Sequence, residues 1–328
     1  MLLALALLTL ADPGPVFGTA RLPAGVERVY AGTAEEVGRG VANPFRKRHE
    51  LEVRLLVLDS HAGGADMAIL TRVWPLADPV VAVPAAALTG RDVPTRGDPS
   101  VRLDLVRVDP RGRVGKLSTS PFAVGPLAAS SPLPDGPPDR LPAVETGFFV
   151  PLPPRPVRQG DGWTDGTDPP TLWTVGGEVG WNGAAAVAVT AVRQTAGFDT
   201  PATALTGWRR TDTLTVPPAD GFAVVLERVV QRREGGAVVG ELRVRYEQKT
   251  AGRLSGRLLG EARREAEAAC RFAADLAPLV AQGPRADPRL VRQRLVAVRK
   301  HLDDGPARGP FREAVEAVRA GGEGLLKR

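Results

Sequence analysis

The side chains that most often carry out catalysis are scarce in this sequence. Its 328 residues include three histidines and one cysteine. We expect His49, His61 and His301 at a charged strand entry, in a turn and near a helix end, where each is a surface residue. Ser60 precedes His61, but adjacency in sequence does not place a hydroxyl group on its neighbour's imidazole. Because the GxSxG, HExxH and GxxxxGK[ST] motifs are also absent, we predict no enzyme activity and assign no catalytic residue.

Tryptophans are concentrated in one part of the chain. Four of the five lie between residues 157 and 250, namely Trp163, Trp173, Trp181 and Trp208. Indole rings gathered in this way line ligand pockets, and they also fill the cores of sheets. Core packing is the favoured interpretation, and the same four residues are the candidate ligand-binding residues.

Metal and thiol chemistry have little support. The sequence DGWTDG resembles the first half of a calcium loop, with Asp161 at position one and Asp165 at position five. Position twelve is Leu172, which offers no oxygen ligand, so we interpret the segment as a polar turn. Cys270 has no partner for an intramolecular disulfide and is expected as a small apolar residue on a helix. We predict no metal and no cofactor.

The net charge of +6 belongs to the C-terminal part of the chain. Residues 252–328 contain 16 Lys and Arg against 10 Asp and Glu, which accounts for the whole excess. Acidic residues interleave with the arginines there, so solvated helix faces with i,i+4 ion pairs are the favoured explanation. Contact with an acidic partner or a membrane surface is the alternative. We expect no nucleic-acid partner.

The N-terminus predicts export. Residues 1–10 form an apolar run that is too short to cross a bilayer but typical of a secretory signal peptide. Gly18-Thr19-Ala20 offers a cleavage site, so residues 1–20 are the expected signal peptide. No Lys or Arg precedes the run, which leaves open a start codon further upstream. No later stretch is apolar enough to be a transmembrane segment, and we expect the mature protein in the periplasm or outside the cell.

Two strand-rich segments are predicted, residues 21–122 and residues 157–250. In the first, Glu50 to Leu55 alternates charged and apolar side chains, which is typical of a strand with one face in a core. In the second, Glu241 to Glu247 alternates in the same way, and Asn182-Gly183 favours a tight hairpin turn. Whether the segments form one sheet or two domains stays open.

A proline-rich connector and a helical tail complete the expected organisation. Prolines crowd residues 123–156, so we expect an extended connector there. Residues 255–320 are expected to be helical, with Asp287 and Pro288 starting one helix and Pro278 kinking or ending another. Apolar stripes predict that the tail docks on the β body; they consist of Leu290, Leu295, Val298, Leu302, Phe311, Val315 and Val318. The predicted fold class is α+β, mainly β: two antiparallel segments, forming a curved sheet or a sandwich, followed by the helical tail.

Structural tryptophans, glycines and charged residues recur through the second segment: Gly160-x-x-Trp163, Trp173-Thr174-Val175, Asn182-Gly183, Trp208-Arg209-Arg210-x-Asp212, Gly221 and Glu227-Arg228-Val229. This set resembles a family of uncharacterised exported proteins of GC-rich bacteria. In longer members a β-rich region and a helical tail precede a thioredoxin-like (redoxin) domain. The resemblance covers about residues 24–320, and because this sequence has no CxxC motif, the family's thiol chemistry does not carry over.

Two classes of function follow. The first is a non-enzymatic exported scaffold or binding module of the cell envelope, with an envelope protein or a redoxin-type protein as its partner. The alternative is a periplasmic lipid or lipoprotein carrier, whose curved sheet encloses an apolar cavity. The sequence does not indicate the oligomeric state.

Overall fold

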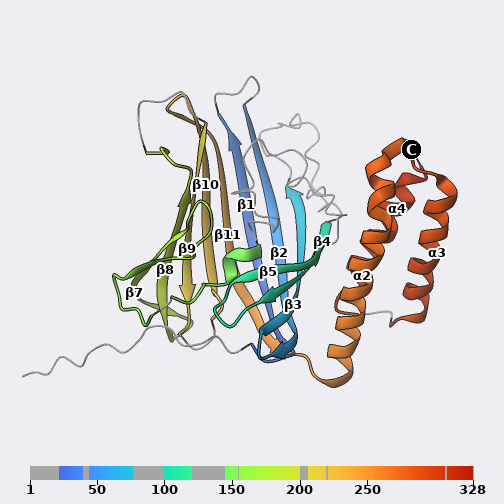
Figure 1. Cartoon of the computed structure of the whole chain (residues 1–328), viewed down its shortest axis with the longest axis horizontal. Helices are drawn as coiled ribbons and strands as arrows, with labels where there is room; N and C mark the ends of the chain where they lie inside the picture. The colour runs from blue at the N-terminus through green and yellow to red at the C-terminus, as the bar shows by residue number, and fades with distance from the viewer. Residues whose placement is uncertain are drawn as a thin grey trace, which may run out of the picture.

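The computed structural model describes residues 22–39, 44–76, 99–119, 145–153, 155–199, 206–218, 221–306 and 309–327. One curved antiparallel sheet dominates it, and three α-helices stand outside the curve (Figure 1). The prediction of a mainly β fold followed by C-terminal helices is confirmed. The expected signal peptide and residues 123–144 of the expected connector lie outside the described residues.

The elements follow the predicted order. The strands are β1 (Val26–Gly38), β2 (Phe45–His61), β3 (Gly64–Leu76), β4 (Ser100–Val108), β5 (Val114–Thr119), β6 (Gly162–Thr164), β7 (Leu172–Trp181), β8 (Ala184–Gln194), β9 (Gly207–Val216), β10 (Val225–Glu234) and β11 (Ala237–Arg253). The helices are η2 (Glu145–Phe148), α2 (Gly256–Gln282), η3 (Gly283–Arg285), α3 (Pro288–Asp304) and α4 (Arg312–Leu325).

Both predicted β segments belong to one sheet. Its eleven strands run in the order β5-β4-β3-β2-β1-β11-β10-β9-β8-β7-β6. The segments join where β1 pairs with β11, in a register that sets Ala34 opposite Val244. This pairing makes the first strand and the last strand neighbours at the centre of the sheet.

The alternating pattern buries one face of each strand inside the curve. On β2 the inward side chains Leu51, Val53 and Leu55 are each at most 1% exposed. At the end of β2 the outward side chains Leu56 and Leu58 are buried too, because helices cover the outer face there. The break in alternation that the sequence shows at this point therefore marks a strand covered on both sides.

The helical tail docks on the outer face of β2 to β5. Helices α2 and α4 contact the sheet, whereas α3 packs on α2 and α4. Polar contacts fix the position: Arg72 pairs with Glu313, and the Arg54 guanidinium donates to the Pro310 carbonyl at 2.9 Å. Leu290, expected in the apolar stripe of α3, is instead 46% exposed. Only the face of α3 that packs on the other helices is buried, and Leu290 does not belong to it.

Local sequence signals account for where α3 begins and α2 ends. The Asp287 carboxylate accepts a hydrogen bond from the Arg289 amide at 2.8 Å and so caps α3. Pro278 does not end α2, because the helix continues for four residues to Gln282. Proline removes the hydrogen bond that an amide at position 278 would donate to the preceding turn. The helix ends soon afterwards at Gly283, whose φ is positive.

Cys270 lies buried in α2 and forms no disulfide. We expect Cys270→Ala to lower the free energy of unfolding by about 1 kcal/mol, since it removes one small apolar atom from a packed layer. Urea unfolding of both proteins measures the difference. A thiol reagent should label the wild-type protein only after unfolding; rapid labelling of the native protein would contradict this placement.

Candidate functional site

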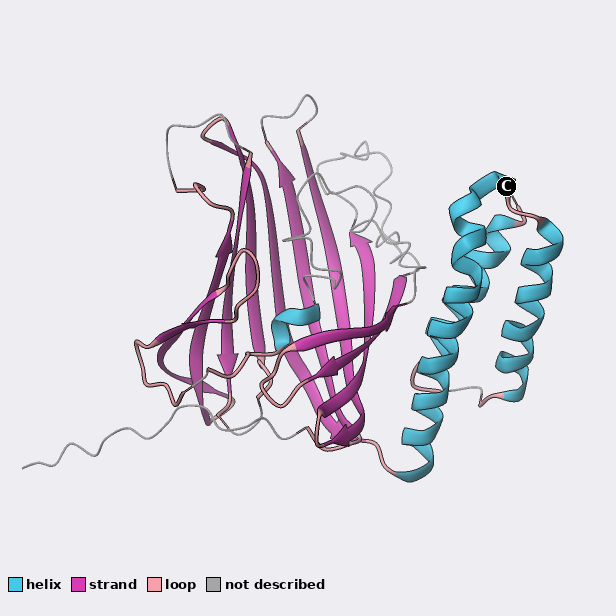
Figure 2. Cartoon of the chain, in the orientation of Figure 1, coloured by secondary structure: helices cyan, strands magenta, loops and turns pink. Residues whose placement is uncertain are grey.

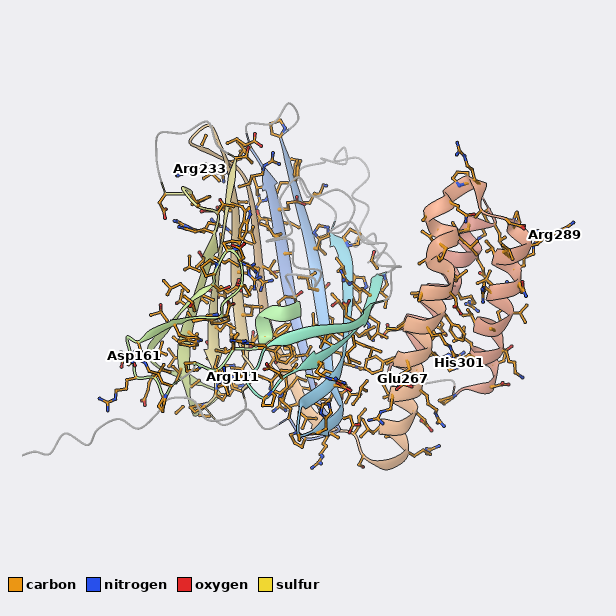
Figure 3. The ribbon with its side chains drawn as sticks, in the orientation of Figure 1. Arg111, Asp161, Arg233, Glu267, Arg289 and His301 are labelled. Atoms are coloured by element: carbon orange, nitrogen blue, oxygen red, sulfur yellow. The ribbon has the colours of Figure 1, made fainter. Side chains whose placement is uncertain are left out.

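Strand register arranges the inward side chains of the sheet in rows. The rows toward the lower end are mainly apolar. One of them crosses six strands and consists of Val189, Leu214, Leu226, Tyr246, Gly32 and Leu51. The next row toward the upper end consists of Ala191, Asp212, Arg228, Val244, Ala34 and His49. The expectation that His49 is a surface residue is wrong, because this inward position leaves it 2% exposed. The inner face thus changes from apolar to polar within two residues on β9, β10 and β2, while it stays apolar on the other strands of the row. Figure 3 shows the two ends, with Arg233 near the upper end and Arg111 near the lower end.

A segment of the connector covers the apolar rows. We call residues 145–153 the plug segment; it consists of η2 and the extended residues that follow. Figure 2 shows η2 inside the curve of the sheet, on the side opposite the three α-helices. Phe148 is fully buried, with its ring 4.2 Å from that of Tyr30 and 5.2 Å from that of Tyr246. Phe149 adds a contact with Phe222 at 5.5 Å between ring centroids.

Few main-chain hydrogen bonds hold the plug segment. The Ala223 amide donates to the Phe148 carbonyl at 2.9 Å, and the Leu152 amide donates to the Arg111 carbonyl at 2.6 Å. The indole of Trp163 donates to the Pro151 carbonyl at 3.0 Å. The plug segment is therefore attached mainly by its buried apolar side chains.

The structure brings together two of the four tryptophans named from the sequence. Trp163 and Trp173 are buried and stacked, with ring centroids 6.1 Å apart, beside the plug segment. Trp181, at the β7–β8 turn, and Trp208, at the start of β9, are half-buried and lie elsewhere. Assignment of all four to one ligand site remains a prediction.

The calcium-like sequence was interpreted as a polar turn, but its central residues form strand β6, and polar turns lie on either side of it. The Asp165 carboxylate accepts hydrogen bonds from the amides of Thr167 and Thr171 at 3.0 and 3.2 Å. Burial opposes ionisation of Asp165, but hydrogen bonds from Thr167 and Thr171 outweigh it and keep the pKa below its ordinary value. Asp161 accepts from the Arg158 amide at 2.8 Å. Within the described ranges, no three acidic, histidine or cysteine side chains are grouped to hold a metal ion.

A buried charge cluster lies directly above the apolar rows. Asp212 receives two hydrogen bonds from Arg228, at 2.7 and 2.9 Å, and others from Arg210. Burial alone would raise the pKa of Asp212, but the charges of Arg210 and Arg228 outweigh it and lower that pKa to about 2. Burial and the charge of Arg210 also lower the pKa of Arg228. Asp212 is therefore ionised at any physiological pH.

Arg228 and Asp212 are not among the site residues predicted from the sequence, although one signal was present. Arg228 has the same strand parity as Leu226 and Val230, which face the core. A charge at an inward position of an alternating strand predicts a buried polar partner. The partner itself lies on β9, and local pattern does not identify it.

Two further hollows are lined by described residues. One, of about 510 Å³, lies at β10, β11, β1 and β2; its lining includes Arg228 and His49 of the row above, together with Glu35, Arg48, Glu227, Arg243 and Arg245. The other, of about 220 Å³, lies between the helices. The paired charges of the first, such as Arg245 with Glu227 at 3.2 Å, are those of a solvated sheet surface.

Comparisons with known proteins identify no family, since no protein-family model and no curated protein matches the chain. Rv2717c from M. tuberculosis aligns at 13% identity over 70% of this chain and 93% of its own, with a TM-score of 0.23. DynF from the dynemicin biosynthesis pathway of Micromonospora chersina aligns at 8% identity over 75% and 88%, with a TM-score of 0.20. A domain titled as an outer membrane lipoprotein-sorting protein from Vibrio parahaemolyticus aligns at 8% over 70% and 86%, with a TM-score of 0.16.

These likenesses are too distant to bear on the fold or the ligand of this chain. Membrane anchoring by a helix finds no support in the part of the chain that the structure describes, where no helix is long and apolar enough to cross a bilayer.

Proposed function

We propose that the protein is a non-enzymatic, exported binding module of the cell envelope that holds an apolar or amphiphilic molecule, such as a lipid, on the inner face of its sheet. One observation carries the proposal. Among the residues that the structure describes, the apolar rows inside the curve are covered by the short, irregular plug segment and not by a second sheet or a long helix. A concave, apolar face of this kind has the properties of a ligand-binding site. In this structure the plug segment occupies it.

The plug segment binds the inner face in a way that lets a ligand replace it. Its affinity for the sheet comes from side chains such as Phe148 and Phe149, each of which stabilises its buried position by about 1.5–3 kcal/mol. An acyl chain offers comparable apolar area and requires no main-chain partners. A ligand of that kind replaces the plug segment without leaving buried polar groups of its own unsatisfied.

Fluorescent fatty acid binding tests the proposal. We expect the wild-type protein to bind the fatty acid and Phe148→Ala to bind it about 10-fold more tightly or better, because a weakened plug segment competes less. Phe311→Ala is the matched control: Phe311 is also fully buried, but in the helical layer. Its affinity should equal that of the wild type.

Equal affinity of Phe148→Ala and Phe311→Ala would show that the plug segment does not compete. If none of the three proteins binds the fatty acid, the carrier role is wrong, and a scaffold that docks a protein through its surface is the better account.

A further inference from the structure

The charge cluster on β9 and β10 has one more positive than negative charge. Arg228 and Arg210 both bind the carboxylate of Asp212, each through more than one hydrogen bond. The side chains of Asp212 and Arg228 are 2% and 1% exposed, and that of Arg210 is 12% exposed. One carboxylate neutralises one guanidinium, so a unit of positive charge remains in a site that excludes water.

Arg228 also has donor capacity to spare. Its Nε and Nη2 donate to Asp212, but its buried Nη1 has no hydrogen-bond partner among the described residues. Buried charged donors without a partner are costly, and native proteins retain them where a ligand supplies the acceptor. A guanidinium that presents free N–H groups matches a carboxylate or a phosphate.

Neighbouring arginines do not share this spare capacity. Arg193 lies opposite Arg210 in register, but its Nε and Nη2 donate to the carbonyls of Pro169 and Asp168 at 2.9 and 3.0 Å. Arg232, two inward positions further up β10, pairs with Glu234. Compared with Arg193, Arg210 and Arg232, Arg228 is the arginine with a buried nitrogen that has no hydrogen-bond partner among the described residues.

The plug segment covers this guanidinium. At Gly147 an added Cβ would lie 2.3 Å from Nη2 of Arg228 and 2.8 Å from the side chain of Leu226. Glycine therefore lets the plug segment rest against both the arginine and the apolar row below it. A molecule that replaces the plug segment meets Arg228 at its upper end and the apolar rows along the rest of its length.

We propose that Arg228, assisted by Arg210, receives the anionic group of the bound molecule, a carboxylate or a phosphate on an apolar chain. This inference rests on the proposed function and specifies its ligand class as an anionic amphiphile. The apolar rows bind the chain, and Arg228 sets its direction, with the charged end toward the upper end of the sheet.

The test compares three ligands in the Phe148→Ala background: oleate with a carboxylate, lysophosphatidate with a phosphate, and monoolein with neither. Inorganic phosphate serves as a competitor that lacks an apolar chain. Arg228→Met removes the excess charge and leaves Asp212 paired with Arg210. We expect this variant to bind oleate and lysophosphatidate at least 10-fold more weakly and monoolein unchanged. Arg243→Met, on the outer face, is the matched control and should change none of the affinities.

Arg228→Lys provides a second variant in case Arg228→Met does not fold. It keeps the charge but loses the planar fork, and we expect it to weaken both anionic ligands while sparing monoolein. If Arg228→Met and Arg228→Lys bind all three ligands like the parent, the assignment of Arg228 is wrong and the proposed function stands. If inorganic phosphate alone binds, with Arg228 required, the site takes a free anion and the amphiphile is wrong. If the parent binds no ligand, the proposed function fails, and this inference with it.

Discussion

Asp212→Asn will lower the free energy of unfolding by about 3–5 kcal/mol, the cost of removing one partner of a buried ionic cluster. The substitution keeps the shape of the side chain but leaves Arg210 and Arg228 buried without a counter-charge. Urea or thermal unfolding at pH 7 measures the effect. Asp199→Asn is the control, because Asp199 pairs with Arg209 at the surface and its loss should leave the stability unchanged.

The same residue predicts how stability depends on pH. Its pKa is about 2 in the folded protein and 3.8 in the reference state, so the folded state favours the ionised form. This contribution, on the order of 2 kcal/mol, is present above pH 3.8 and is lost as the pH falls toward 2. Asp212→Asn should lack this component of the acid transition. A mutant that loses stability over the same pH range as the wild type would contradict the assignment.

Leu70→Asp will detach the helical layer from the sheet. Leu70 is 1% exposed on the outer face of β3, within the apolar cluster that includes α2 and α4. A carboxylate there has no partner, and burying it costs several kcal/mol, so the helices separate or the whole protein melts earlier. Limited proteolysis should show new cleavage near Leu254 and Ser255, where β11 leads into α2.

Val229→Asp is the matched control for this experiment. Val229 points to the same outer face on β10, beyond the helical layer, and lies opposite Arg243. We expect this carboxylate to be tolerated and the cleavage pattern to stay that of the wild type. Equal resistance of both variants to protease would mean that the helices do not depend on this surface.

Local sequence patterns predicted the strands and helices well, because alternation and helical spacing report which face of an element is buried. They did not predict that β1 pairs with β11. These strands are about 200 residues apart, and a register such as Ala34 opposite Val244 depends on the whole sheet. The choice between one sheet and two domains therefore needed the structure.

The plug segment was missed for a different reason. Prolines such as Pro151 and Pro153 indicate a stretch outside regular structure, and we interpreted it as a linker. The apolar run Phe148-Phe149-Val150 within it is buried at 5% exposure or less. A segment excluded from strands by proline still packs in a core through the side chains between the prolines.

The charge cluster was missed because alternation gives the face of an arginine and not its partner. Arg228 and Asp212 are opposite each other only in the β9–β10 register. Trp163 and Trp173, by contrast, come from strands that pair directly, and their proximity follows from the short β6–β7 pairing. Trp163, Trp173 and Arg228 all belong to strands β6 to β11, and the assignment of the tryptophans to a ligand site stays a prediction.

Hydrogen–deuterium exchange of residues 145–153, with and without oleate, tests the central claim most directly. In the free protein the Leu152 amide donates to the Arg111 carbonyl, and Gly147 to Val150 are buried, so exchange there should be slow. If oleate takes the place of the plug segment, the same amides should exchange faster while those of β10 and β11 stay protected. Unchanged or slower exchange of residues 145–153 at saturating oleate would contradict an inner face that binds its ligand by releasing the plug segment.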